Sequence, residues 1–361
     1  MKTQFPAGTT GDLRRRLLAW FGKHRRALPW RASRDPYRIW VAEIMLQQTR
    51  IATVIPYYER FLAHFPTVES LAGACEEEVL LLWSGLGYYS RARNLQRAAK
   101  EIVAKHAGKF PRTFEATLRL PGVGRYTAAA VLSIAYDASL AVLDGNVARV
   151  LARLGAIRGD LRAPHRWRSL QEMAQALLAP QAPGDWNQAL MELGEVICTP
   201  RSPSCSKCPI AKSCRAKALG LTDKIPAPRR KRAPVNVRIA AAILRDPRGR
   251  VLLVRDPGKH DEVLFSRMWQ FPAVAVAEHP EKELAAHVAS ALGIDSPPFE
   301  TLPTARHGVT FRNIALLPFL ARVPRLPKLA RTRILSLDQL AALPVSSATR
   351  KIAASLVALQ S

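Results

Sequence analysis

The sequence predicts two domains, an all-α domain followed by an α+β domain. At 361 residues the chain is too long for one ordinary hydrophobic core. From residue 12 to about residue 219, apolar residues recur at spacings of three and four, with Pro and Gly at short intervals, as in many short packed helices. Two β-branched or apolar runs, 237–244 and 250–255, follow this region and predict strands.

The helical domain is expected at 1–224, and no stretch within it has the pattern of a strand. Its clearest apolar helix faces are Val41-Ile44-Met45, Val79-Leu80-Trp83 and Val147-Val150-Leu151-Leu154.

A basic, proline-rich linker is expected at 225–235, because four consecutive cations, Arg229 to Arg232, lie between prolines there. The α+β domain then covers 236–361. Within it, Asp246-Pro-Arg-Gly249 separates the two runs and predicts a hairpin turn. Helices are expected near 281–292 and 347–359.

The composition indicates a globular protein with an anionic partner. The chain holds 54 Lys and Arg against 28 Asp and Glu, a net charge of +26 to which both domains contribute. Nucleic acid is the leading partner for such an excess, although an arginine-rich proteome would also produce it. With 48% hydrophobic and 23% charged residues, collagenous, disordered and disulfide-scaffold classes are excluded.

The sequence predicts a cytoplasmic protein with no membrane association. No apolar run approaches the ~20 residues that span a bilayer, and the first twelve residues lack the apolar core of a signal peptide. Four of the five cysteines lie between 198 and 214, which suits a reduced compartment and a metal. Cys75, on a helical segment, is expected to be a small buried hydrophobe.

The crowded cysteines form the strongest single motif, Cys198-x6-Cys205-x2-Cys208-x5-Cys214. Four thiolates so closely spaced can converge on one tetrahedral or cubane centre. Zinc ribbons pair two C-x-x-C knuckles, whereas this run has one. It resembles the iron–sulfur loop of the endonuclease III family of DNA glycosylases, which implies a [4Fe-4S] cluster, with zinc as the alternative.

A second motif, Leu120-Pro-Gly122-Val-Gly124-Arg-Tyr126, precedes an apolar helix. Its glycines allow a tight turn whose N–H groups, at a helix N-terminus, can bind a phosphate. Alone the motif is weak evidence. Together with a helical approach at 113–118 and the basic chain, it resembles a helix-hairpin-helix DNA-binding element at about 113–134.

Two acidic residues are candidates for chemistry. Asp144 lies where an apolar stretch meets a helix start, so it is expected to cap that helix. A capping carboxylate is held ionised and oriented, which also suits stabilisation of a sugar cation. Glu43 shares a helix face with Gln47, and apolar neighbours such as Trp40 would desolvate it and raise its pKa. Without further context, a surface or ion-paired role for Glu43 would be the commoner one.

Five segments provide that context, because they occur in the order found in adenine DNA glycosylases of the MutY type. The resemblance is very specific over residues 12–220 and fainter in the C-terminal half, where that family carries a Nudix-like domain that senses 8-oxoguanine. The segments are Glu43-x-Met-Leu-Gln-Gln-Thr, Gly85-Leu-Gly-Tyr-Tyr-Ser-Arg-Ala92, the glycine turn, Leu-Asp144-Gly-Asn-Val and the cysteine loop.

The resemblance implies a hydrolase that removes adenine paired with 8-oxoguanine or guanine after flipping it out of the duplex. Glu43 would protonate the departing base, and Asp144 would stabilise the oxocarbenium-like sugar. Tyr126 would hold the geometry between them. Bifunctional relatives have a Schiff-base lysine in place of Tyr126, and a phenol cannot form an imine, so a monofunctional enzyme is implied.

The resemblance also implies DNA contacts. Trp30, Arg31 and Gln188 would line the adenine pocket, while Gln48 and Tyr88 would fill space in the unstacked duplex. The expected partner is double-stranded DNA with adenine opposite 8-oxoguanine or guanine, bound by a monomer associated with the bacterial nucleoid.

The C-terminal half departs from its family pattern in two places. Residues 281–293 lack the acidic R-E-x-x-E-E core of a Nudix hydrolase, so metal-dependent pyrophosphate hydrolysis is not expected. Where the family usually has Phe-Ser-His, this chain has Val309-Thr310-Phe311. Thr310 keeps a hydroxyl and His307 is a nearby imidazole, so we expect 8-oxoguanine to be distinguished from guanine less tightly.

Three other functions remain open at this point. A mismatch thymine glycosylase would share the cysteine loop and the tyrosine, but Gln188 and the long C-terminal domain count against it. A non-catalytic DNA-damage binder would need neither Glu43 nor Asp144. A redox-sensing transcription factor would leave the Glu43 helix unexplained.

Overall fold

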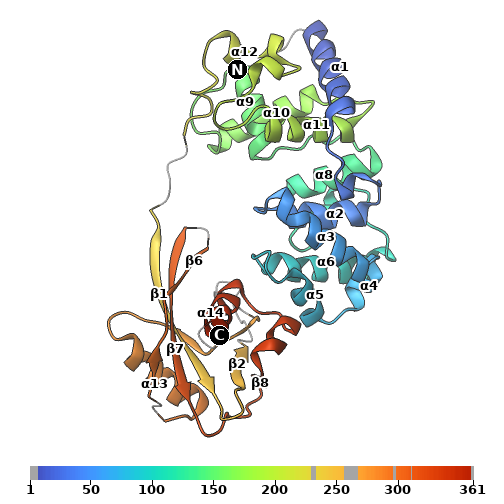
Figure 1. Ribbon diagram of the computed structural model, residues 1–361. Helices are drawn as coiled ribbons and strands as arrows, with labels where there is room; N and C mark the ends of the chain where they lie inside the picture. Colours follow the sequence, from blue (N-terminus) through green and yellow to red (C-terminus); the bar gives the residue numbers. More distant parts are fainter. Residues whose placement is uncertain (1–6, 229–232, 256–266, 296–297, 310, 359–361) are drawn as a thin grey trace. The chain divides into compact units, whose positions relative to one another are not determined.

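The computed structural model describes residues 7–228, 233–255, 267–295, 298–309 and 311–358. They form two compact units (Figure 1). The helical unit comprises Met1–Gly73 and Asn94–Arg230, and the C-terminal unit comprises Ala74–Arg93 and Lys231–Ser361. No strand occurs within the described residues 7–228, whereas the C-terminal unit contains a sheet. The prediction that an all-α domain is followed by an α+β domain is therefore confirmed.

The helical unit consists of short helices, several of which begin with proline at the first helical position, where no N–H partner is needed. Its elements are α1 (Ala7–His24), η1 (Pro29–Arg31), α2 (Pro36–Leu46), α3 (Ile51–His64), α4 (Val68–Gly73), most of α6 (Ser90–His106), α7 (Phe114–Leu118), α8 (Arg125–Tyr136), α9 (Gly145–Gly155), α10 (Pro164–Leu177), α11 (Pro183–Val196), η2 (Cys205–Lys207), η3 (Ala211–Ser213) and α12 (Arg215–Ala218).

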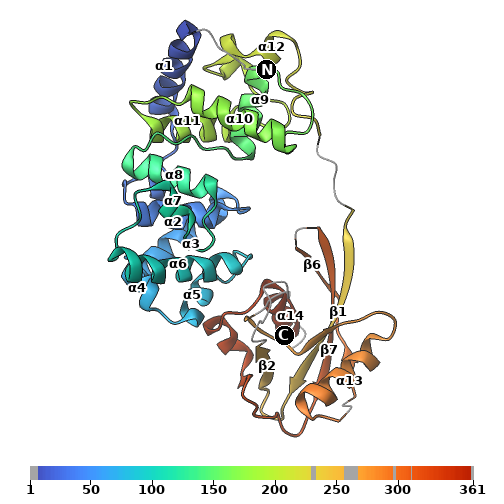
Figure 2. The same cartoon turned by 180° about the vertical axis from the view of Figure 1, so that it is seen from behind.

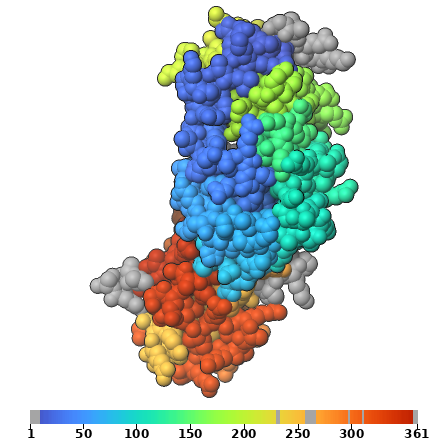
Figure 3. All heavy atoms as spheres, turned by 90° about the vertical axis from the view of Figure 1, so that its right-hand side faces the viewer, coloured from blue at the N-terminus to red at the C-terminus, as the bar shows by residue number. Residues whose placement is uncertain are grey.

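Helix α8 is central to this unit, because it packs against α2 on one side and α11 on the other (Figures 1 and 2). Gly184 makes the approach of α11 possible, since a Cβ there would lie 2.5 Å from the carbonyl oxygen of Ser133 on α8. Helix α1 packs against α11, and Figure 3 shows the blue N-terminal residues beside the yellow-green residues of later helices. Segments far apart in the sequence therefore meet around α8.

The predicted helix-hairpin-helix element is present as α7, a glycine turn and α8. Thr113 caps α7 by accepting a hydrogen bond from the backbone N–H of Ala116. Gly122 has a φ of +75°, and a Cβ there would lie 2.7 Å from the Cβ of Asn94, so glycine is required twice over. Gly124 is the N-cap of α8 and has open space beside it.

The C-terminal unit is a mixed sheet with a helix on each face. The strands run in the order β3-β2-β1-β7-β5, while β4, β6 and β8 pair with β1, β7 and β2. Its elements are α5 (Glu76–Trp83), β1 (Val235–Arg245), β2 (Val251–Arg255), β3 (Trp269–Gln270), β4 (Ala273–Ala275), α13 (Pro280–Leu292), β5 (Glu300–Thr301), β6 (Ala305–Val309), β7 (Arg312–Arg322), β8 (Thr332–Leu335), η4 (Leu337–Ala342) and α14 (Ser347–Ala358).

Alternate residues of β1 build two hydrophobic cores, because successive strand side chains point to opposite faces. Ala240, Ala242 and Leu244 pack with α13, and Ala241 and Ile243 pack with α14. The predicted hairpin is formed by β1 and β2, and the two helices predicted in this half are α13 and α14. None of the helices in the described part of the chain is both long and apolar enough to cross a membrane.

Two expectations need correction. Cys75 is exposed and is the N-cap of α5, where a side chain lies outside the apolar helix face. Gln47 is the C-cap of α2, and its amide donates a hydrogen bond of 3.4 Å to the hydroxyl of Thr127 on α8. Ile225, expected to begin the linker, is 1% exposed and belongs to the helical core. The cations 229–232 lie outside the described residues, and the predicted domain limits stay predictions.

Candidate active site

A pocket of about 360 Å³ in the helical unit brings together most of the residues singled out in the N-terminal sequence. Its lining comes from η1, α2, α8, α11 and the start of α9. The predicted residues that line it are Trp30, Arg31, Glu43, Gln48, Tyr126, Asp144 and Gln188.

Glu43 is buried, with 6% of its surface exposed. The pKa of Glu43 is raised from 4.5 to about 7 overall. Burial is the largest cause; the hydrogen bond with Tyr126 and the charge of Arg31 act against it, and the Asp144 carboxylate adds to it. The predicted desolvation of this carboxyl is therefore confirmed. A carboxylic acid with a pKa near 7 can hold a proton at neutral pH and donate it.

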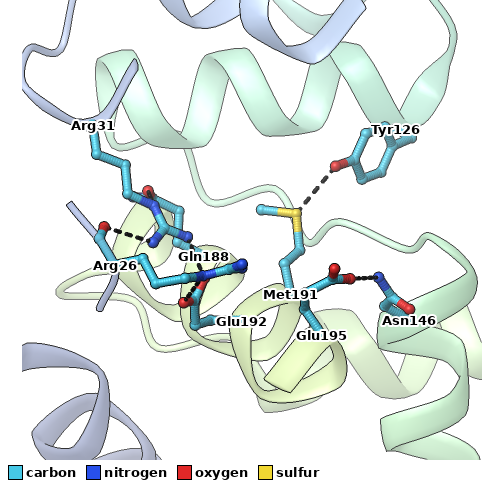
Figure 4. Close-up of polar contacts among 8 residues, drawn as sticks. All are labelled: Arg26, Arg31, Tyr126, Asn146, Gln188, Met191, Glu192 and Glu195. Carbon is cyan, nitrogen blue, oxygen red and sulfur yellow. Dashed lines mark hydrogen bonds and ion pairs between the residues drawn. The ribbon is translucent and has the colours of Figure 1, made fainter. Parts of the chain in front are cut away.

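Tyr126 lies in the first turn of α8 and places its hydroxyl between two acceptors. The hydroxyl donates to Sδ of Met191 at 3.1 Å (Figure 4). It also forms a hydrogen bond with Glu43, which lowers the pKa of that carboxyl. Burial raises the pKa of Tyr126 well above 10, and the nearby carboxyls of Glu43 and Asp144 raise it further. The phenol therefore stays protonated and acts as a donor.

Asp144 is the N-cap of α9, as expected. Its carboxylate accepts a hydrogen bond of 2.7 Å from the backbone N–H of Val147. Burial raises the pKa of Asp144, whereas this hydrogen bond and the Arg149 cation lower it. Because helix N-terminal N–H groups favour a charged carboxylate, Asp144 is the member of the pair suited to remain ionised beside a protonated Glu43.

Another part of the pocket lining is a network of hydrogen bonds and ion pairs around Arg31 (Figure 4). Arg31 donates through Nε to Oε1 of Gln188 at 3.1 Å and through Nη2 to Glu192 at 2.9 Å. Arg26 donates to both oxygens of Glu192 at 2.5 and 3.0 Å. Burial alone would raise the pKa of Glu192, but the two arginines outweigh it and lower that pKa.

Sequence reasoning missed several pocket residues. Glu192 lies four residues after Gln188 on α11, so a polar pair at helical spacing, on one face of the helix, was the available signal. Asn146 and Glu195 form another part of the lining, joined by a hydrogen bond of 3.3 Å (Figure 4). Arg26 belongs to no motif and could not be identified from the sequence.

Trp30 is 8% exposed and its ring packs edge to face on Tyr58 at 5.4 Å. The two residues expected to enter the duplex share an unusual backbone. Gln48, which lines the pocket, has a φ of 60°, and Tyr88 in the C-terminal unit has a φ of 48°. Non-glycine residues rarely adopt this conformation, and such strain is concentrated at functional sites.

The four cysteines of the loop line one small cavity with Arg153. Arg153 is 2% exposed and donates to Sγ of Cys198 at 3.3 Å and to the carbonyl oxygen of Thr199 at 2.7 Å. Burial raises the pKa of the Cys208 thiol to about 12, and the neighbouring cysteines add to this shift. Four half-buried cysteines that line one cavity beside a buried cation form a donor set that fits an anionic thiolate centre.

His307 lies half-buried on β6, and burial together with the charge of Lys351 lowers its pKa. Thr310 is outside the described residues, so its expected contact stays a prediction. Phe311 follows β6, and its carbonyl oxygen accepts a hydrogen bond of 2.8 Å from the N–H of Val235. Val309 is the last residue of β6, and Phe311 directly precedes β7.

Comparison with known proteins places the helical unit in a family. Residues 41–172 match the model described as HhH-GPD superfamily base excision DNA repair protein. An adenine DNA glycosylase of Rattus norvegicus is 50% identical over 212 residues, covering 56% of this chain and 41% of the relative. One of Arabidopsis thaliana is 36% identical over 317 residues, covering 77% and 50%.

A solved thermostable thymine-DNA glycosylase is 31% identical, with a TM-score of 0.54, and covers 59% of this chain and 98% of that chain. The chain thus spans half or less of the length of the two curated relatives, but nearly all of this solved enzyme. On this evidence, the chain belongs to the HhH-GPD superfamily of base excision DNA repair proteins.

Proposed function

We propose that the chain is a monofunctional adenine DNA glycosylase, which hydrolyses the N-glycosidic bond of adenine opposite 8-oxoguanine or guanine. The observation that carries this proposal is the buried Glu43, which lines one pocket with Tyr126 and Asp144 and has a pKa raised to about 7. The same pocket presents Arg31 and Gln188 for base recognition. Curated relatives named adenine DNA glycosylase support this assignment.

The chemistry follows from the two carboxyls. Glu43 protonates a ring nitrogen of the flipped adenine, which makes the base a better leaving group. The C–N bond then breaks, the base leaves with the bond electrons, and positive charge develops on the sugar. Asp144, ionised at the N-terminus of α9, stabilises that charge until water adds to the sugar carbon and gives its proton to the Glu43 carboxylate, which restores the acid. Tyr126 donates its hydrogen bond and keeps the two carboxyls in place.

The absence of an amine at Tyr126 supports a monofunctional reaction. Lyase chemistry requires an imine between the enzyme and the sugar, and a phenol cannot form one. The product is therefore an abasic site in an unbroken strand, which breaks only after treatment with alkali.

A [4Fe-4S] cluster would be held by Cys198, Cys205, Cys208 and Cys214. Within the described residues, no group of three or more His, Cys, Asp or Glu side chains is arranged to hold a single metal ion. A zinc ion would also accept four thiolates, but zinc ribbons pair two C-x-x-C knuckles and this loop has one, which favours the cluster. When bound, the cluster would cross-link the loop that carries the exposed Arg201 and Lys207.

The partner that fits this protein is double-stranded DNA. The net charge of +26, the open N-terminus of α8 at Gly124 and the exposed loop cations suit a phosphate backbone. The Nudix-like half would read the base opposite adenine. We further propose that the protein acts as a monomer in the cytoplasm, at the bacterial nucleoid.

A mismatch thymine glycosylase is the second candidate, because the solved thymine-DNA glycosylase is 31% identical to this chain. Gln188 separates the two functions, since its amide, oriented by Arg31, offers both a donor and an acceptor for adenine. The test is strand cleavage on duplexes containing adenine opposite 8-oxoguanine, adenine opposite guanine and thymine opposite guanine, with and without hot alkali. Cleavage of the adenine strands after alkali supports the proposal. Cleavage of the thymine strand alone supports the second candidate.

A further inference from the structure

The segment that carries Tyr88 belongs to the C-terminal unit. Residues 74–93 form one compact unit with the C-terminal sheet, although they lie within the N-terminal half of the sequence. Helix α5 in this segment begins with Glu76, Glu77 and Glu78 in a chain whose net charge is +26. Their partners explain why acidic residues are gathered here.

The Glu77 carboxylate is surrounded by three donors of the C-terminal sheet. Its Oε1 accepts a hydrogen bond of 2.9 Å from the indole N–H of Trp269 and lies 3.2 Å from Arg333. Its Oε2 lies 3.5 Å from Arg255. Both guanidinium groups also lie over the Trp269 ring, at 4.8 and 5.8 Å, so the indole and the arginines form one cage around Glu77.

Further contacts attach both ends of α5 to residues near Trp269 and on α14. At its start, Glu76 pairs with Arg267 at 2.8 Å. After its last residue, the buried Ser84 hydroxyl donates to the carbonyl oxygen of Val345 at 2.7 Å and accepts from Arg350 at 2.9 Å. Val345 forms a backbone bridge with Trp269, so the partner of Ser84 is joined directly to the partner of Glu77.

The Tyr88 loop is built on the end of α5. Trp83 donates its indole N–H to the carbonyl oxygen of Gly87 at 3.2 Å. Arg91 lies over the rings of both Trp83 and Tyr88, at 5.5 and 5.4 Å, and donates to the Gly87 carbonyl oxygen at 3.3 Å. The strained backbone of Tyr88 is therefore held by contacts that depend on where α5 lies.

We propose that Glu77 is a positioning residue for base excision: its contacts with Trp269, Arg333 and Arg255 fix α5 on the C-terminal sheet. They thereby hold residues 84–91, the loop after α5 and the start of α6, which present Tyr88. Only the role of Tyr88 in the duplex rests on the proposed function. The C-terminal domain then acts on excision through the Tyr88 loop as well as through its own contacts with DNA.

A purely stabilising role explains these contacts less well. Partly exposed ion pairs add little stability, and the Glu77 side chain is 28% exposed. The contacts have a different effect: the carboxylates of Glu76 and Glu77 meet three arginines and one indole N–H, and α5 can satisfy all of these partners in only one position. It also removes Arg255, Arg267 and Arg333 from the cations available to phosphate.

Amide hydrogen exchange on the full-length free protein tests this placement without any assay of activity. The variants are Glu77→Ala, Glu77→Gln, which keeps an acceptor for Trp269, and Glu59→Ala on the exposed side of α3 as the matched control. We expect faster exchange over residues 84–91 in Glu77→Ala, a smaller increase in Glu77→Gln and none in Glu59→Ala. Unchanged exchange over 84–91 in Glu77→Ala would overturn the proposal.

Two further measurements keep the outcome clear. If amide exchange in Glu77→Ala becomes faster throughout the chain, Arg333→Gln is used in its place, and we again expect faster exchange over residues 84–91.

In single-turnover excision from duplexes with adenine opposite 8-oxoguanine, Glu77→Ala should be roughly 3- to 30-fold slower than wild type, and Glu59→Ala should equal wild type. If Glu77→Ala excises adenine at the wild-type rate, Glu77 has no role in excision. If the wild type itself is inactive, the proposed function is wrong, and the hydrogen-exchange result alone decides whether Glu77 holds residues 84–91 in place.

Discussion

Arg31 and Gln188, separated by 157 positions in the chain, are joined by a hydrogen bond of 3.1 Å. The bond fixes the orientation of the Gln188 amide, because Arg31 occupies its oxygen. It also links η1 to α11 across the pocket that holds Glu43. This wall of the pocket is therefore organised by contacts within the protein itself.

Replacing Gln188 by Leu should reduce kcat/KM for adenine excision by roughly 5- to 150-fold, because a partly buried hydrogen-bonding group is lost from the pocket and Nε of Arg31 loses its acceptor. Steady-state rates on the duplex with adenine opposite 8-oxoguanine measure the effect. Gln181→Leu, at an exposed position just before α11, is the matched control and should behave as wild type. Equal losses in both variants would show that the pocket wall has no special part in recognition.

Excision should depend on pH through Glu43. Burial raises the pKa of Glu43 to about 7, and the acid form is the one that donates a proton. The single-turnover rate should thus be level below pH 7 and fall about tenfold for each further pH unit above it. A rate that rises between pH 7 and 9 would mean that Glu43 does not act as an acid.

Local chemistry in this chain could be predicted from the sequence because it depends on neighbouring residues. Asp144 caps α9 as expected, since capping needs only one side chain and the following N–H groups. The desolvation of Glu43 followed from the apolar residues beside it in α2. Gly122 has the positive φ that its turn requires.

Long-range features could not be predicted in the same way. The parallel pairing of β1 with β7 joins Val235 to Arg312, and no local pattern specifies a partner so distant. Glu77 on α5 meets cations that follow 178 and 256 residues later, Arg255 and Arg333, and no local pattern indicates these partners. The exposed position of Cys75 depends on where α5 begins, and helix limits are the least certain part of a periodic pattern.

The cysteine loop should bind iron. Cys205→Ser removes one of four ligands, so we expect less soluble protein, loss of iron and weaker DNA binding together, because the loop presents Arg201 and Lys207. Metal analysis of anaerobically purified wild-type protein, with DNA titrations of both forms, measures this. Cys75→Ser, outside the loop, is the control. Stoichiometric zinc without iron in the wild type would refute the cluster.

The triplet Val309-Thr310-Phe311 should set the choice between 8-oxoguanine and guanine. Restoring Phe-Ser-His should raise the ratio of excision rates on the two adenine duplexes by roughly 5- to 150-fold, since a side-chain hydrogen bond to a base is worth about 1 to 3 kcal/mol. His307→Ala in the original chain tests whether that imidazole contributes. A ratio that does not rise would mean that another loop reads the oxidised base.

The release of free adenine in a single turnover, by wild type and by Glu43→Gln, tests the central claim most directly. The substrate is a duplex with adenine opposite 8-oxoguanine, and binding of the same duplex is measured for both proteins. The wild type should release adenine and leave the strand intact until alkali is added. Glu43→Gln should bind the duplex but release adenine at least about 100-fold more slowly, since it has no proton to donate. Release by Glu43→Gln at the wild-type rate, or no release by the wild type, would contradict the account.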